Sequence, residues 1–174
     1  MKGLLVIGAF LALAFVFHIA SLAAQPAGAG KATGGSFANG ITRLELTKVL
    51  TSHGMTVRDA TQNEADPWLK ARTPKGVEFY INMYQCAGEG PSGRRCTNLQ
   101  FLAQWERNKN TTIEAANVYN QKFVFGRAYL SEDGKTFMFD YSINIQDGVT
   151  TGNLRKQVDN WLRVLDDVRG LIRV

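Results

Sequence analysis

Two alternating segments joined by a short loop constrain the fold of this chain more than any other feature of its sequence. Apolar and polar residues alternate over 77–86 and again over 96–105, which is typical of strands with one buried face. If Cys86 lies opposite Cys96 in an antiparallel hairpin, every apolar residue faces another one. The predicted pairs are Met83 with Leu99, Ile81 with Phe101, Phe79 with Ala103, and Val77 with Trp105. A shift of one residue would destroy the match, so the cysteines and the apolar pattern select the same register.

This register predicts a disulfide between Cys86 and Cys96, which is also expected of a cysteine pair if the chain is exported, as its N-terminal residues indicate below. Closing so short a loop should stabilise the fold by roughly 2.5–3 kcal/mol on the chain-entropy model. The alternative is a redox-active pair. Such a pair favours closer spacing, although Arg94 and Arg95 supply the positive charge that activates a thiol.

A second hairpin is predicted from strands at 124–130 and 136–145, joined at Asp133-Gly134, a dipeptide typical of two-residue turns. Its apolar residues collect on one face through the following pairs: Leu130 with Phe137, Ala128 with Phe139, Gly126 with Tyr141, and Val124 with Ile143. On the opposite face, Arg127 and Asp140 form a structural cross-strand pair. Such a pair contributes at most ~1 kcal/mol if it is exposed.

The first helix is predicted from a capping box, in which Thr42 and Glu45 satisfy the free N–H groups of its first turn. Leu46 and its helical neighbours form an apolar face, and Gly54 supplies the left-handed stop. His53 lies at the helix end, where we expect it to cap the helix or to border the core.

Two more helices and two short strands complete the expected elements. A second capping box, from Thr111 to Glu114, predicts the middle helix, and a broad apolar stripe predicts the last one. The expected ranges are 55–60 and 68–73 for the strands, and 112–121 and 153–172 for the helices. The order is therefore αββββαββα: an α+β fold with an antiparallel sheet and helices mainly on one face.

The N-terminal residues predict an export signal. No charged residue occurs from Gly3 to Ala24, and small residues follow the apolar run, so residues 1–24 are expected to be a signal peptide cleaved after Ala23 or Ala24. The alternative is an uncleaved anchor, in which residues 4–24 hold the protein in the inner membrane. Residues 25–40 are rich in Gly and Ala and predict a flexible linker, followed by one domain over 41–174. We therefore expect a periplasmic or secreted protein.

Composition excludes several function classes. With 174 residues, 45% of them hydrophobic, the chain can build one domain with a core. Its formal charge of +5 is small for a nucleic-acid-binding protein, so no nucleic acid partner is expected. Two Cys and two His leave little material for a metal site or a histidine-based catalytic centre. We therefore expect no cofactor, no metal and no catalytic residue, and the turn at Glu132-Asp133 lacks the alternating acids of a calcium loop.

Several motifs together resemble the YbjN family of bacterial proteins, sometimes labelled sensory-transduction regulators. They are His53-Gly-Met55, Tyr84-Gln-Cys86 followed by Cys96-Thr-Asn-Leu-Gln-Phe101, Asn117-Val-Tyr-Asn120, Gly126-Arg-Ala-Tyr-Leu-Ser-Glu-Asp-Gly134, and Gly148-Val-Thr-Thr-Gly-Asn-Leu154 leading into the Trp161 helix. The resemblance covers about 41–172. It implies the fold of type III secretion chaperones and a binding module without known catalytic residues. Those chaperones are cytosolic homodimers that hold extended segments of effector proteins, whereas this chain begins with an expected export signal.

The sheet face opposite the helices is the candidate binding site. It is expected to carry an unusual number of large apolar and aromatic side chains: Tyr80, Tyr84, Leu102, Phe125, Tyr129 and Met138. Tyr, Phe and Met are enriched in protein interfaces. The alternative is that a strand, the linker or the second helix covers this face.

These observations predict an exported, non-catalytic, chaperone-like or regulatory module that binds a protein segment or a second copy of itself. Contact with a membrane is expected only if the N-terminal segment is retained. One alternative is an envelope redox protein or other enzyme that uses Cys86 and Cys96, and another is a membrane-tethered structural protein. A weaker candidate is the loop over 88–95, whose N–H groups and two arginines could hold an anion, although a plain disulfide-closed hairpin is favoured.

Overall fold

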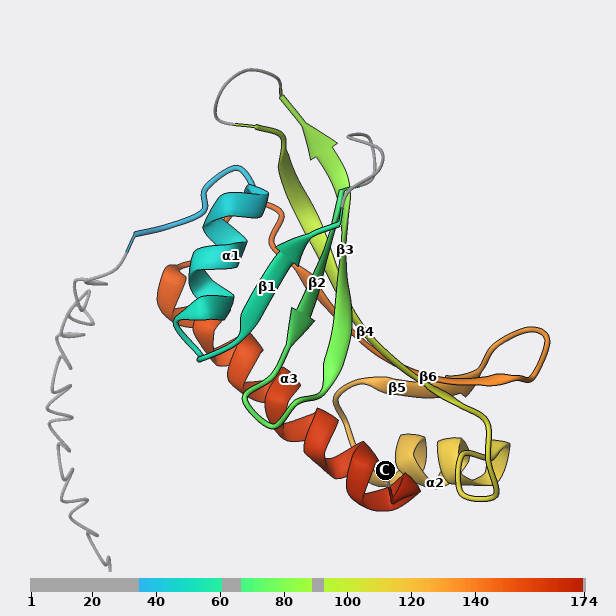
Figure 1. The fold of residues 1–174 in the computed structure, drawn as a ribbon. Helices are drawn as coiled ribbons and strands as arrows, with labels where there is room; N and C mark the ends of the chain where they lie inside the picture. Colours follow the sequence, from blue (N-terminus) through green and yellow to red (C-terminus); the bar gives the residue numbers. More distant parts are fainter. Residues whose placement is uncertain (1–34, 61–66, 89–92, 174) are drawn as a thin grey trace, which may run out of the picture. The chain divides into compact units, whose positions relative to one another are not determined.

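The computed structural model describes residues 35–60, 67–88 and 93–173 (Figure 1). Within them the elements are α1 (Arg43–Thr51), β1 (Thr56–Asp59), β2 (Trp68–Arg72), β3 (Glu78–Ala87), β4 (Arg95–Glu106), α2 (Ile113–Lys122), β5 (Arg127–Leu130), β6 (Thr136–Asn144) and α3 (Thr151–Ile172). The strands form one antiparallel sheet in the order β1-β2-β3-β4-β6-β5. The predicted α+β fold and element order are confirmed. The predicted signal peptide lies outside the described residues, and no helix among those described is long and apolar enough to cross a membrane.

The β3–β4 hairpin has the predicted register, with Cys86 opposite Cys96 and Ile81 opposite Phe101. The ladder ends at the pair of Tyr80 with Leu102, so the two expected pairs beyond it, Phe79 with Ala103 and Val77 with Trp105, are not part of it. Past this point β4 continues to pair with β6, and Figure 1 shows these two strands bending away from β3 together. The twist and bend of the sheet therefore limit the length of the hairpin.

The β5–β6 hairpin also has the predicted register, with Ala128 opposite Phe139 and Arg127 opposite Asp140. The predicted strand is too long, because β5 begins only at Arg127. The expected pairs of Gly126 with Tyr141 and of Val124 with Ile143 are therefore wrong. Gly126 has a φ of 82°, which turns the chain before the strand begins, and Val124 is 91% exposed.

Residues 131–135 join β5 to β6, and the tight turn within them is centred on Glu132 and Asp133 rather than on the expected Asp133 and Gly134. The Gly134 N–H donates to the Ser131 carbonyl at 2.8 Å, and Gly134 adopts a φ of 66°. Asp133 Oδ1 accepts hydrogen bonds from the Ser131 hydroxyl at 2.7 Å and from the Lys135 N–H at 3.1 Å. Asp133 and Gly134 therefore stabilise the turn without being its only residues.

The capping box of α1 is confirmed: the Glu45 N–H donates to Thr42 Oγ1 at 3.2 Å, and the Thr42 N–H donates to Glu45 Oε2 at 2.9 Å. At α2 the predicted box is wrong, because Thr112 is the cap and accepts from the Ala115 N–H. Thr111 is instead buried, and its hydroxyl oxygen accepts from a backbone N–H of the preceding loop. The sequence places two threonines side by side, and burial of the first leaves the second to cap the helix.

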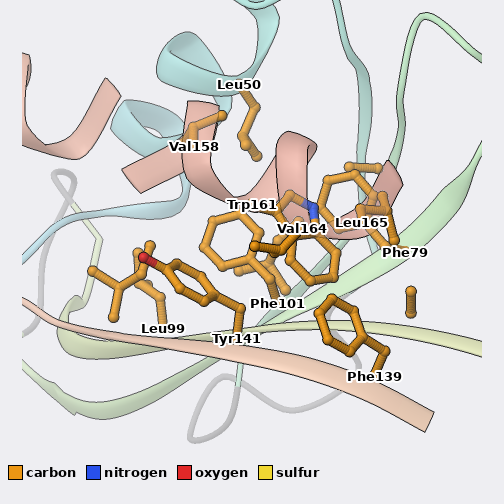
Figure 2. Packing of buried hydrophobic residues seen from close by; sticks show 14 of the residues in the cluster. Leu50, Phe79, Leu99, Phe101, Phe139, Tyr141, Val158, Trp161, Val164 and Leu165 are labelled. Carbon is orange, nitrogen blue, oxygen red and sulfur yellow. The ribbon is translucent and has the colours of Figure 1, made fainter. Parts of the chain in front are cut away.

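One hydrophobic core fills the space between the sheet and the helices, with Trp161 of α3 at its centre (Figure 2). The fully buried indole ring packs against Phe79, Phe101 and Phe139, with ring centroids 5.3, 5.6 and 5.6 Å away. These aromatic rings come from three neighbouring strands, so α3 crosses the middle of the sheet. α2 lies on the same side, because Tyr119 packs edge-on against Phe139 at 4.9 Å.

The folded part of the described chain begins before the expected boundary at Ile41. Phe37 is buried, and its N–H donates to the Val149 carbonyl at 2.8 Å. The Gly35 carbonyl accepts from both the N–H and the hydroxyl of Thr151, at 2.9 and 2.7 Å. Residues 35–40 of the predicted linker are therefore packed on the domain, because Phe37 supplies the apolar anchor that the rest of the Gly- and Ala-rich stretch lacks.

Candidate functional site

The candidate site is the side of the sheet that faces away from the helices, which we call the reverse face. One row of paired side chains crosses all six strands on this side, from β1 to β5: Arg58, Lys70, Tyr80, Leu102, Asp140 and Arg127. At the usual spacing of strands, the row extends over roughly 24 Å. The alternate residues of the same strands, such as Phe79 and Phe101, lie in the core on the other side.

Five of the six predicted site residues lie on the reverse face. Tyr80 and Leu102 are neighbours in the row, Met138 and Tyr129 pair beside it, and Tyr84 lies further along β3. Tyr84 is 41% exposed, and the other four are partly buried.

Phe125 does not belong to this face, so that part of the prediction is wrong. Its ring lies 6.4 Å from Tyr141, a core residue, and 6.0 Å from the guanidinium of Arg163 on α3. The reason is the turn at Gly126, which breaks the strand alternation on which the prediction depended.

Trp68 is an aromatic residue of the reverse face that the sequence reasoning missed. Its register partner is Asn82, and its ring centroid lies 5.5 Å from that of Tyr80. The signal was present, because Trp68 stands two residues before Lys70 in a predicted strand and so shares its face.

Asp140 is a buried carboxylate on β6, next to the edge strand β5, and three side chains donate to it. Arg127 donates through Nε to Oδ1 at 3.3 Å and through Nη2 to Oδ2 at 2.6 Å. Oδ2 also accepts from Gln100 Nε2 at 2.8 Å and from the Tyr129 hydroxyl at 3.2 Å. The predicted pair of Arg127 with Asp140 is therefore present, as part of a larger network.

The charge of this network changes the pKa of its members. Burial and the nearby charge of Asp140 raise the pKa of the Tyr129 hydroxyl, so the tyrosine remains a neutral donor. The hydrogen bond to Asp140 raises the pKa of Arg127. The Arg127 guanidinium also lies 4.7 Å from the centroid of the Tyr129 ring, a cation–π geometry that helps to fix both side chains.

The network continues across the sheet through Gln100. Its Oε1 accepts from the Tyr84 hydroxyl at 3.0 Å and from Asn82 Nδ2 at 3.3 Å. Side chains of β3, β4, β6 and β5 are therefore joined in one hydrogen-bonded group. Such a group holds the exposed aromatic ring of Tyr84 in a defined position, which reduces the entropy lost when a partner binds.

The surroundings of the two cysteines are typical of a structural disulfide. Cys86 and Cys96 form a disulfide, and Cys96 is fully buried. Both neighbouring arginines donate to backbone carbonyl groups: Arg94 to that of Cys86 itself, and Arg95 Nη2 to that of Gly40 at 2.7 Å. Of the loop proposed as an anion site, residues 89–92 lie outside the described part.

His53 has the expected role at the end of α1. Its Nδ1 lies 2.8 Å from the Val49 carbonyl oxygen, and its Nε2 lies 3.4 Å from Asp159 Oδ1 on α3. The imidazole therefore joins a helix end to the neighbouring helix. Over the described ranges, no group of three or more His, Cys, Asp or Glu side chains is arranged to hold a metal ion.

Comparison with known proteins gives the family. The family model described as "Putative bacterial sensory transduction regulator" (YbjN) matches residues 42–172. The chain belongs to the YbjN family. Among solved structures it is similar to YbjN from E. coli, described as "a putative transcription regulator", with 17% identity, a TM-score of 0.47, and coverage of 73% of this chain and 84% of that chain. No curated protein matches the chain. The YbjN description names a regulator rather than an enzyme.

Proposed function

We propose that this YbjN-family chain is an exported, non-catalytic module that binds a segment of another protein through its reverse face. The observation that carries the proposal is the hydrogen-bonded group around Asp140. A buried carboxylate with three donors on the open side of a sheet holds Arg127, Tyr129 and, through Gln100, Tyr84 in fixed positions. Preorganised aromatic and arginine side chains are the residue types that dominate binding energy in protein interfaces.

The redox alternative has less support. A reactive thiol needs access and a positively charged environment. Cys96 is fully buried, and both neighbouring arginines donate to backbone carbonyl groups. The disulfide therefore supports a structural interpretation better than a catalytic one.

The proposal is tested by site-specific photo-cross-linking in intact cells. A photoreactive residue at position 84 should capture a defined protein band, because Tyr84 is the most exposed aromatic residue of the network. The same residue at position 113 is the matched control, since Ile113 is apolar and similarly exposed, at 45% against 41%. Ile113 lies on α2, away from the reverse face.

The captured band should disappear when Tyr129→Ser is introduced, because this change removes a side chain of the face without altering the cross-linking position. Equal capture from positions 84 and 113, or capture that Tyr129→Ser leaves unchanged, would contradict the proposal. Mass spectrometry of the N-terminus of the same protein tests export: a chain that begins at Ala24 or Gln25 supports it, and a chain that retains residues 1–24 supports the membrane-anchored alternative.

A further inference from the structure

The β1–β2–β3 end of the reverse face contains a hollow of about 210 Å³, which we call the basic hollow. It is lined by Thr56, Arg58, Lys70, Ala71, Arg72 and Glu78. All four charged residues lie on the reverse face, because Arg58 pairs with Lys70 and Arg72 pairs with Glu78 in the sheet register. Three are cations and one is an acid.

The carboxylate of the basic hollow is shared between two of the cations. Glu78 Oε2 lies 2.9 Å from Lys70 Nζ, and Glu78 Oε1 lies 2.8 Å from Arg72 Nη2. The hydrogen bonds from Lys70 and Arg72 lower the pKa of Glu78, so it remains ionised at neutral pH. It balances only one of the three positive charges.

Arg58 places a further positive charge beside Lys70. It is exposed and lies directly opposite Lys70 on the neighbouring strand, and no acidic side chain of the described chain pairs with it. Like charges opposite each other destabilise a strand pair. A pair of like charges that costs stability, such as Arg58 opposite Lys70, is typical of a functional site. An anion bound between the two side chains would remove their repulsion.

The basic hollow is continuous with the aromatic part of the reverse face. Lys70 Nζ lies 5.8 Å from the centroid of the Tyr80 ring, and the centroid of the Trp68 ring lies 5.5 Å from that of Tyr80. A segment that crosses the face from Tyr84 toward β1 therefore meets aromatic rings first and cations afterwards.

We propose that the protein segment bound by the reverse face is acidic and places a carboxylate side chain in the basic hollow, between Arg58 and Lys70. The inference rests on the proposed function and adds the charge of the partner. A guanidinium and an ammonium group side by side match a carboxylate, which accepts from both. The lining residues include no helix N-terminus, which is a common feature of sites for free phosphate.

The test uses the protein as recovered from cells and a fluorescent peptide of ten glutamates, with binding followed by anisotropy. A peptide of ten glutamines is the uncharged control. Arg58→Gln should weaken binding of the glutamate peptide about five-fold, the size of one exposed ion pair. Arg155→Gln removes the same charge from the exposed side of α3 and should leave binding unchanged. Arg58→Gln is not expected to unfold the protein, because Arg58 is exposed and the register of β1 with β2 is a backbone pairing.

Equal losses with Arg58→Gln and Arg155→Gln would overturn the inference, because net charge alone would then explain binding. Equal affinity for the glutamine peptide would also overturn it. A competition with inorganic phosphate tests for a free anion, with the same concentration of chloride as the control. If phosphate displaces the peptide from the wild type but not from Arg58→Gln, and chloride has no effect, the basic hollow binds a free anion instead.

Failure of the inference is distinguishable from failure of the proposed function. If cross-linking at position 84 captures a partner but peptide binding does not depend on Arg58, only the acidic character of the partner is wrong. If position 84 captures no partner, the proposed function fails, whatever the peptide shows.

Discussion

Ile41 and Cys96 exchange two backbone hydrogen bonds, in which the Ile41 N–H donates to the Cys96 carbonyl at 3.0 Å and the Cys96 N–H donates to the Ile41 carbonyl at 2.9 Å. This pairing attaches the residue that precedes the N-cap of α1 to the disulfide-bearing end of β4. Arg95 and Glu45 lie beside it and form an ion pair at 3.0 Å. The disulfide, the strand and the N-terminus of the helix therefore form one junction, whose parts should respond to one another.

Gly40→Ala is expected to destabilise this junction. Gly40 has a φ of 84°, and an added Cβ would lie 2.6 Å from the Cys96 carbonyl oxygen. Gly76 is the matched control, because its φ is 83° but nothing lies within 4 Å of its added Cβ. Gly40→Ala should therefore lower the free energy of unfolding by roughly 1–3 kcal/mol more than Gly76→Ala, as measured by urea denaturation. Equal losses would show that the close approach has no energetic effect.

Removal of the disulfide is expected to lower stability without abolishing the fold. The double variant Cys86→Ala and Cys96→Ala should lose roughly 2.5–3 kcal/mol, because the unfolded chain gains the entropy of an open loop. Urea denaturation of the oxidised wild type, the reduced wild type and the double variant measures this difference. The last two should unfold at similar urea concentrations. A double variant as stable as the oxidised wild type would contradict the prediction.

Glu45 is expected to make stability depend on pH. Burial acts to raise the pKa of its carboxyl, but hydrogen bonds from the Thr42 N–H and from Arg95 outweigh it, so the pKa lies below the ordinary 4.5. A pKa that is lower in the folded state stabilises the fold above the unfolded value, and this contribution disappears as pH falls through the folded value.

The free energy of unfolding should therefore be larger for the wild type than for Glu45→Gln at pH 7, and the difference should shrink as pH falls below 4.5. Denaturation curves from pH 7 down to acid measure it. Glu132→Gln, a change in the exposed β5–β6 turn, is the control. A difference of the same size at neutral and acidic pH would disprove the role of the Glu45 charge.

Asp140→Asn is expected to destabilise the hydrogen-bonded network that joins β3, β4, β6 and β5 on the reverse face. An amide cannot accept from Arg127, Gln100 and Tyr129 as a carboxylate does, and its NH₂ group would face other donors. The loss should be about 1–3 kcal/mol in urea denaturation. Asp166→Asn is the contrast, because Asp166 forms an exposed pair with Lys75 and its loss should stay below about 1 kcal/mol. Similar losses for the two variants would argue against a special role for the network.

Asn120 on α2 is expected to protect the edge of the sheet. Its side chain binds the free edge of β5 at Ala128, where it accepts from the backbone N–H and donates to the carbonyl, each at 2.9 Å. An uncovered edge strand can pair with another chain. Asn120→Ala should therefore lower stability by about 1–2 kcal/mol and increase self-association in sedimentation velocity. Asn117→Ala, on the exposed side of the same helix, should do neither. Identical behaviour of the two variants would exclude this role.

The hairpin registers could be predicted because the apolar alternation permits only one pairing of each strand with its neighbour. The lengths of the strands could not, because apolar residues continue beyond the point where the backbone departs from the sheet. Val77 and Val124 both fit the alternation, yet Val77 precedes β3 and Val124 is almost fully exposed. Sheet twist and a glycine with positive φ decide these ends, and neither is visible in the apolar pattern.

Most of the candidate site could be predicted for the same reason, since residues that alternate with the core must lie on the reverse face. The partners of Asp140 could be predicted only in part. Arg127 is its neighbour in a local hairpin, but Gln100 lies on β4, which reaches β6 only after α2 and β5 have intervened in the sequence. No local pattern states which distant strand will be adjacent.

The hydrogen bonds around Asp140 all donate in the same sense, which makes the two ends of the network chemically different. Because a carboxylate only accepts, the nitrogen of the Gln100 amide must point toward β6 and its oxygen toward β3. The Tyr84 hydroxyl then directs its proton inward and presents lone pairs to solvent, whereas Arg127 at the other end offers the N–H groups that Asp140 does not use. A chain bound between β3 and β5 would therefore meet an acceptor at Tyr84 and donors at Arg127, so a single charge on β6 would distinguish a peptide from the same peptide turned end to end.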